Sequence, residues 1–217
     1  MEQEILKTWQ KKVIDFLVSF PGFENFYLTG GTTLAAFYLQ HRISDDLDFF
    51  SYDDIDPIFI HDLATKIKNF LGASEMRFSR LYDRYQFFYL IGDNKEEIKI
   101  EFAKYPFLQV EPIKIFNGLS VDSERDIAVN KLAAILDRFD PKDFVDLYFL
   151  LPKFSLNELK KGIEMKFGIK TDPLFLGSEL SKVRRIEALP KMIKPLTVEE
   201  LKDFFMSEIK KISSEII

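Results

Sequence analysis

The chain changes character at about residue 120, and this change constrains the fold more than any other feature. Up to that point short apolar runs alternate with turn residues, whereas after Ser123 apolar residues recur at helical spacing. Strands are predicted at 26–28, 46–50, 85–91, 98–102 and 113–116. Helices are predicted at 4–20, 34–40, 58–71, 126–138, 142–151, 156–167 and 197–216. We therefore expect an α+β fold, with a mixed sheet and flanking helices in residues 1–120 and a helical lobe in residues 121–217.

Composition excludes several kinds of site. The 217 residues include no cysteine, which excludes disulfides, zinc fingers and thiol nucleophiles. Residues 1–12 carry charges of both signs and no apolar signal core, and no apolar run approaches the ~20 residues of a membrane span. We expect a cytoplasmic protein that has no membrane partner.

Charge is distributed unevenly along the chain. The net charge is -5, which argues against non-specific coating of nucleic acid. Residues 1–152 hold 17 basic and 25 acidic side chains, whereas residues 153–217 hold 13 and 10. A basic group in the second part is either a solvated helical surface or a contact for a phosphate backbone. Its members are Lys182, Arg184, Arg185, Lys191 and Lys194.

The acidic part contains a pair of aspartates with strand spacing. Asp46 and Asp48 alternate with Leu47 and Phe49, so on a strand the two carboxylates share one face. Two neighbouring carboxylates repel each other, and a divalent cation removes that repulsion. Magnesium, or manganese in its place, prefers oxygen ligands and commonly binds one or two carboxylates together with substrate phosphates. The pair therefore predicts a metal site.

A glycine turn precedes this strand. Gly30, Gly31 and Thr32 lie between a predicted strand and a predicted helix. Glycines allow the backbone to approach a ligand closely, and free N–H groups at a helix start attract anions. The turn is either a phosphate-binding loop or a tight turn closed by a threonine, and its position before the aspartate pair favours phosphate.

A third carboxylate is expected from a neighbouring strand. Glu101 follows Ile100 and precedes Phe102, so its side chain lies on the face opposite to theirs. It is either a solvent-facing strand residue or a third metal ligand, and we assign it with Asp46 and Asp48 to the catalytic group. One of these carboxylates could also accept the proton of an acceptor hydroxyl.

Two blocks of sequence resemble the AbiEii-type abortive-infection nucleotidyltransferases. The first is Gly30-Gly31-Thr32 followed by His41-Arg42-x-Ser44-x-Asp46-Leu47-Asp48-Phe49-Phe50. The second is Lys131-Leu132-Ala133-Ala134, then Arg138, then Lys142-Asp143-x-x-Asp146-Leu147-Tyr148. The resemblance covers residues 26–151, and two blocks in the right order are more specific than either alone.

The resemblance implies a nucleotidyltransferase-like fold and a reaction of a nucleoside triphosphate (NTP) with Mg²⁺ or Mn²⁺. It implies that Asp46 and Asp48 bind the metal and that the glycine turn binds phosphate. It also implies that Lys131, from the helical domain, contacts the triphosphate in the cleft and that Asp146 is important for the site. Arg42 could position Asp46 or the base, or it could cap the C-terminus of the preceding helix, and we include it in the nucleotide-binding set. The role implied is that of a toxin with a cognate antitoxin, acting on an RNA such as the tRNA 3′ end.

Other functions remain open from the residues. A haloacid dehalogenase phosphatase also has paired aspartates, but its motif needs a threonine soon after them, where this chain has Phe49 and Phe50. A protein of the same fold could bind nucleotides without turnover and act through protein partners. A nucleotidyltransferase for aminoglycoside-like small molecules is a further alternative. In a purely structural interaction protein the motifs would be coincidental, and Lys131, Arg138, Asp143 and Asp146 would form an inter-helix salt-bridge network.

Overall fold

The computed structural model describes residues 5–214, and the chain packs as two compact units. The first unit comprises the chain up to Ala36, together with Ser44–Phe107 and Ile113–Asp122. The second comprises Phe37–Ile43, Leu108–Pro112 and the chain from Ser123 on. The units are thus not the two contiguous segments 1–120 and 121–217, because two short segments of the first half pack with the helical unit.

The first unit is built on a seven-stranded mixed sheet with the order β3-β4-β5-β2-β1-β7-β6. In chain order the strands are β1 (Phe26–Thr29), β2 (Leu47–Ser51), β3 (Glu75–Leu81), β4 (Arg84–Ile91), β5 (Glu96–Lys104), β6 (Lys114–Phe116) and β7 (Leu119–Val121). The pairs β2/β5 and β1/β7 are parallel, and the other pairs are antiparallel. The central parallel pair β2/β5 carries two of the predicted site residues, Asp48 on β2 and Glu101 on β5.

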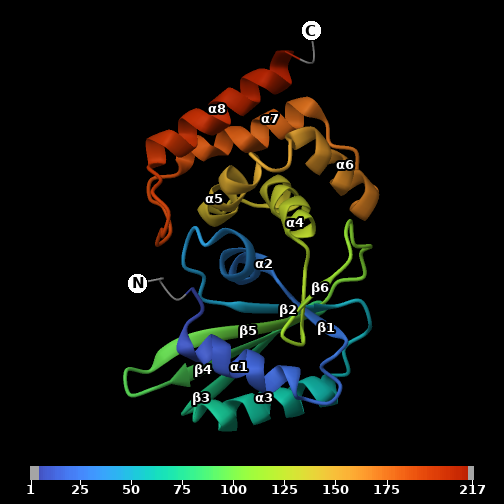
Figure 1. Cartoon of the computed structure of the whole chain (residues 1–217), viewed down its shortest axis with the longest axis vertical. Coiled ribbons are helices and arrows are strands. Elements are labelled where there is room, and N and C mark those ends of the chain that lie inside the picture. Colours follow the sequence, from blue (N-terminus) through green and yellow to red (C-terminus); the bar gives the residue numbers. More distant parts are fainter. Residues whose placement is uncertain (1–4, 215–217) are drawn as a thin grey trace. The chain divides into compact units, whose positions relative to one another are not determined.

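Helices α1 (Thr8–Val18) and α3 (Pro57–Leu71) lie together on one face of this sheet (Figure 1). Much of the core beneath them is aromatic, and Phe49 and Phe102 stack with ring centroids 5.5 Å apart. Both rings are fully buried. Burial of such rings supplies a large part of the hydrophobic stabilisation of this unit.

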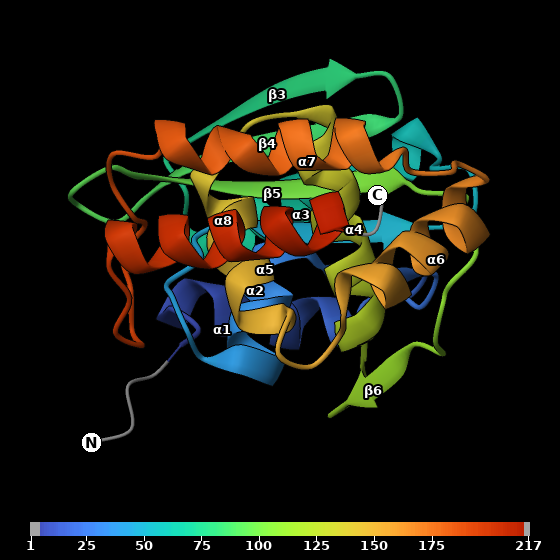
Figure 2. The ribbon, with the colours of Figure 1, turned by 90° about the horizontal axis from the view of Figure 1, so that it is seen from above.

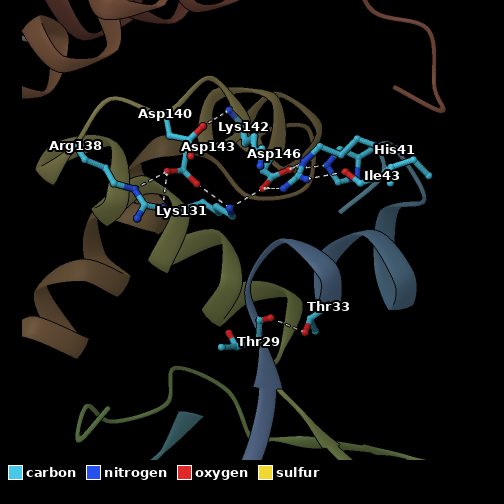
Figure 3. Close-up of polar contacts among 11 residues, drawn as sticks. Thr29, Thr33, His41, Ile43, Lys131, Arg138, Asp140, Lys142, Asp143 and Asp146 are labelled. Atoms are coloured by element: carbon cyan, nitrogen blue, oxygen red, sulfur yellow. Dashed lines mark hydrogen bonds and ion pairs between the residues drawn. The ribbon is translucent and has the colours of Figure 1, made fainter. Parts of the chain in front are cut away.

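The chain leaves β1 through the glycine turn. Helix α2 (Gly30–Thr33) follows the strand directly and continues as a π-helix, Leu34–Leu39, which ends where Gln40 adopts a φ of 51°. The Thr33 hydroxyl donates a hydrogen bond of 2.8 Å to the carbonyl of Thr29 and so fixes the first turn (Figure 3). A π-helix is rare and often marks a functional segment.

The second unit is helical. Its helices are α4 (Glu124–Asp137), α5 (Pro141–Leu150), α6 (Leu156–Phe167), α7 (Pro173–Ser181), a 3₁₀-helix (Lys182–Arg185) and α8 (Val198–Ser214). Helices α7 and α8 run side by side (Figure 2). Capping boxes begin α6, between Ser155 and Glu158, and α8, between Thr197 and Glu200. None of the described helices has the length and apolar character that crossing a membrane requires.

The α+β architecture expected from the sequence is confirmed, with differences in detail. The expected helix 34–40 begins earlier, at Gly30, and is largely a π-helix. The strands β3 and β7 and the helix α7 have no counterpart among the sequence predictions. The end of the last predicted helix, at residues 215 and 216, lies outside the described residues.

Candidate functional site

The pairing of β2 with β5 brings two of the predicted carboxylates together. In this parallel pair Asp48 stands opposite Glu101. Directly paired residues project from the same face of a sheet, so both carboxylates lie on one side. Asp46 immediately precedes β2, and its side chain is 44% exposed, against 25% for Asp48 and 1% for Glu101. Glu101 is therefore a buried residue, and the solvent-facing alternative for it is wrong.

The ammonium group of Lys99 binds all three carboxylates. Its Nζ lies 3.0 Å from Asp46 Oδ2, 3.6 Å from Asp48 Oδ1 and 3.6 Å from Glu101 Oε2. Lys99 precedes Glu101 by two residues on β5, so strand alternation places it on the same face. Burial lowers the pKa of Lys99, but the charges of Asp48, Asp46 and Glu101 outweigh that effect and raise it above its ordinary value. Lys99 is consequently a cation surrounded by the three acidic groups.

Glu101 is also held by two residues of β4. Arg84 Nε donates to Glu101 Oε1 at 2.6 Å, and Gln86 Nε2 donates to Glu101 Oε2 at 2.8 Å. Burial alone would raise the pKa of Glu101, but these hydrogen bonds and the charges of Arg84 and Lys99 lower it below its ordinary value. Glu101 is therefore ionised at neutral pH and fixed in place.

The glycine turn lies directly against the aspartates. A Cβ atom built on Gly30 would lie 2.8 Å from Asp48 Oδ2, and Gly30 has a φ of +78°, so only glycine fits there. The Thr32 hydroxyl donates a hydrogen bond to the backbone carbonyl of Asp46. This bond ties the turn to the start of β2. The turn and the aspartate pair thus lie next to each other in the folded chain.

The carboxylates fit a divalent cation in their chemistry. Within the described residues 5–214, no three His, Asp or Glu side chains are arranged so that they could hold a metal ion between them. The three carboxylates instead converge on one cationic atom, Lys99 Nζ, which shows that they can share a positive charge. Oxygen donors of this kind suit Mg²⁺ or Mn²⁺. Glu101 already accepts bonds from Arg84 and Gln86, so Asp46 and Asp48 are the better placed ligands.

Comparison with known proteins identifies the family. Residues 15–214 match the family described as nucleotidyl transferase AbiEii toxin of type IV toxin–antitoxin systems. The chain belongs to the AbiEii family. It is also 30% identical over 210 residues to an uncharacterised protein of Aquifex aeolicus (strain VF5), covering 95% of this chain and 97% of that one.

Two crystal structures share the fold. JHP933 from Helicobacter pylori is 24% identical with a TM-score of 0.57, covering 95% of this chain and 91% of that one. A candidate nucleotidyltransferase from H. pylori is 22% identical with a TM-score of 0.58, covering 95% and 94%. The nucleotidyltransferase-like fold expected from the sequence is therefore confirmed, and the AbiEii family and this fold together support a nucleotidyl transfer enzyme.

In this AbiEii protein the second block of sequence, together with His41 and Arg42 of the first, builds a buried ion-pair cluster in the helical unit (Figure 3). Asp146, on α5, accepts hydrogen bonds of 2.6 and 2.8 Å from Arg42 and one of 2.7 Å from His41 Nε2. Lys131, on α4, lies 2.6 Å from Asp146 and 2.7 Å from Asp143, which also binds Arg138 at 3.1 Å. An inter-helix salt-bridge network of Lys131, Arg138, Asp143 and Asp146 is thus present.

Burial sets the charges in this cluster. Burial would raise the pKa of Asp146, but Lys131 and Arg42 lower it far below its ordinary value. Burial lowers the pKa of His41, more than Asp146 raises it. His41 is therefore neutral at pH 7, and its Nδ1 has no hydrogen-bond partner among the described residues. The Arg42 guanidinium is buried on Asp146, and only 11% of the Lys131 side chain is exposed.

Some of the basic residues between Lys182 and Lys194 contact acidic or aromatic side chains of the helical unit. Lys182 pairs with Glu179, Arg185 lies 4.5 Å from the centre of the Phe139 ring, and Lys194 lies 5.8 Å from the centre of the Phe149 ring. These contacts fit a solvated helical surface whose cations pack on aromatic rings.

The structure thus brings together the residues predicted in the first unit and adds three to them. Lys99, Arg84 and Gln86 were not predicted as site residues. Part of their spacing carried a signal, since Lys99 precedes Glu101 by two residues on one predicted strand and Gln86 lies on the other strand of the predicted hairpin, whereas Arg84 lies one residue before that predicted strand. Arg42, Lys131 and Asp146 gather in the second unit, and their nucleotide-binding role stays a prediction.

Proposed function

We propose that this protein transfers a nucleotide from an NTP to an acceptor hydroxyl and that Asp46 and Asp48 are the metal-binding carboxylates. The observation that supports this most is the convergence of Asp46, Asp48 and Glu101 on Lys99 Nζ. The close approach of Asp48 to Gly30 supports a phosphate-binding role for the turn beside these carboxylates. A metal ion and phosphate groups could therefore be held side by side next to the central strands β1, β2 and β5.

The proposed reaction is an in-line displacement. The acceptor oxygen bonds to the α-phosphorus, the bond from that phosphorus to the pyrophosphate oxygen breaks, and the acceptor proton is removed. A bound Mg²⁺ or Mn²⁺ supplies charge neutralisation for the triphosphate. Backbone N–H groups of Gly31 and Thr32 hold phosphate oxygens.

Proton removal falls to the aspartates. Both oxygens of Glu101 already accept hydrogen bonds, and its lowered pKa makes it a weak base. Glu101 therefore contributes a fixed negative charge to the site and does not act as the base. Asp46 is the most exposed of the three carboxylates, so its oxygen that does not bind the metal is the one we propose to accept the proton of an incoming hydroxyl.

The proposed biological role is that of a cytoplasmic toxin countered by a cognate antitoxin. The family description supports the toxin assignment. The proposed acceptor is RNA, such as the 3′ end of tRNA, as the family resemblance implies, and its terminal ribose would supply the hydroxyl. Lys131, which pairs with Asp143 and Asp146, is the proposed triphosphate contact that the family resemblance implies.

Incubation with each labelled NTP, total RNA and Mg²⁺ or Mn²⁺ tests this proposal. We expect label to enter an RNA band, and enzymatic removal of the RNA 3′ end to release it. Label transferred to an aminoglycoside instead would support the small-molecule alternative. Magnesium-dependent NTP binding in a thermal-shift assay without transfer to any acceptor would show a binding protein and contradict the proposal.

A further inference from the structure

The position of Lys99 has a consequence for metal binding at the proposed site. Its Nζ lies within 3.6 Å of oxygens from three carboxylates that come from β2, from the residue preceding β2, and from β5. A divalent cation bound by Asp46 and Asp48 needs the same oxygens. Two cations cannot share that place, because like charges a few ångströms apart repel strongly in a partly buried site.

The Lys99 side chain is able to move away from the carboxylates. Its ammonium is a compact charge on a flexible four-carbon stem, and 22% of the side chain is exposed. Arg84 and Gln86 hold Glu101 independently of Lys99, so one carboxylate keeps its partners when the ammonium moves. An NTP bound at the adjacent glycine turn would bring several negative phosphate charges. These charges would attract the Lys99 ammonium once the metal displaces it.

We propose that Lys99 is a resident counter-ion that competes with the divalent metal, so that the free protein binds the metal weakly. The inference rests on the proposed function, since it takes Asp46 and Asp48 as the metal ligands. Lys99 offsets part of the negative charge of the three carboxylates in the free protein and releases them when metal and nucleotide arrive together. Metal loading is thereby coupled to nucleotide binding at the same site.

Binding of Mn²⁺ in the absence of nucleotide tests this inference, with the electron paramagnetic resonance signal of free Mn²⁺ as the readout. Lys99→Met keeps the apolar stem and removes the charge. We expect it to lower the Kd for Mn²⁺ at least about tenfold relative to the unmodified protein, as expected for removing a cation a few ångströms from the metal. Adding Asp48→Asn to this variant is expected to reverse the gain.

Lys104→Met is the matched control. Lys104 lies on the same strand and pairs with the exposed Asp54 at 2.5 Å, so this change alters the net charge equally without touching the carboxylates. We expect its Kd for Mn²⁺ to equal that of the unmodified protein. Lys99→Gln is a second neutral variant should Lys99→Met fail to fold, as judged by circular dichroism.

Two results would overturn the inference. One is a Kd for Mn²⁺ in both neutral Lys99 variants that is no lower than in the unmodified protein. The other is an equal decrease in the Kd for Mn²⁺ in Lys104→Met, which would show that the change in net charge alone explains the effect. If the unmodified protein still transfers nucleotide with Mn²⁺ in either case, the proposed function stands and only the role of Lys99 falls.

Discussion

Asp48→Asn and Asp46→Asn are each expected to reduce the rate of nucleotide transfer by at least about 10²-fold while the protein stays folded. The change keeps the size of the side chain and removes the charge that the metal and Lys99 require. Asp48 also lies against Gly30, so its substitution alters both the metal-binding and the phosphate-binding parts of the site. Initial rates with labelled NTP measure the loss, and circular dichroism melting measures the fold.

The control for these variants is Asp54→Asn. Asp54 is 91% exposed and pairs with Lys104, so the same chemical change occurs on the same unit outside the carboxylate cluster. Its transfer rate is expected to match that of the unmodified protein. Transfer at an unchanged rate in the Asp46→Asn and Asp48→Asn double variant would remove both residues from the mechanism.

Asp146→Asn is expected to lower the free energy of unfolding by about 3–5 kcal/mol, the usual cost of removing one partner of a buried ion pair. The substitution leaves Arg42 and Lys131 buried without the charge that both of them bind. Urea unfolding followed by circular dichroism measures the change. Asp62→Asn is the control, since Asp62 pairs with Lys66 on an exposed helix surface and such pairs contribute less than about 1 kcal/mol. Equal effects of the two substitutions would contradict the structural role of Asp146.

The same ion pairs predict a pH dependence. The pKa of Asp146 is lowered on folding, so its ionised form stabilises the folded state. This stabilisation is fully present above the pKa of an unfolded aspartate, about 3.9, and is lost as the pH falls below it. The difference in unfolding free energy between the unmodified protein and Asp146→Asn should therefore be largest near neutral pH and shrink in acid.

Elements with strong local signals could be predicted from the sequence. Helix α3 ends at Gly72, which adopts the left-handed conformation with a φ of 63°, and α6 begins at the Ser155 capping box. Strand β3 was missed because its side chains are nearly all exposed, so no apolar alternation marks it, and its pairing with β4 defines it. Helix α7 was missed although Asp172 caps it and Pro173 begins it.

Only the site residues that lie close together in the sequence could be predicted as a group. The aspartate pair and the glycine turn are close in sequence, and both are found in one place. The contacts of Lys99, Arg84 and Gln86 depend on the order of strands β4-β5-β2, which a single sequence does not state. The pairing of Arg42 with Asp146 likewise depends on residues 37–43 packing with the helical unit.

The central claim is that Asp46 and Asp48 bind a divalent cation next to a triphosphate held by the Gly30–Thr32 turn. A crystal structure with Mn²⁺ and a non-hydrolysable NTP, read by the anomalous signal of manganese, tests it most directly. We predict a manganese peak within about 2.5 Å of oxygens from both aspartates, with phosphate oxygens bound to the same ion. A manganese peak bound to the triphosphate and distant from both carboxylates would contradict the account.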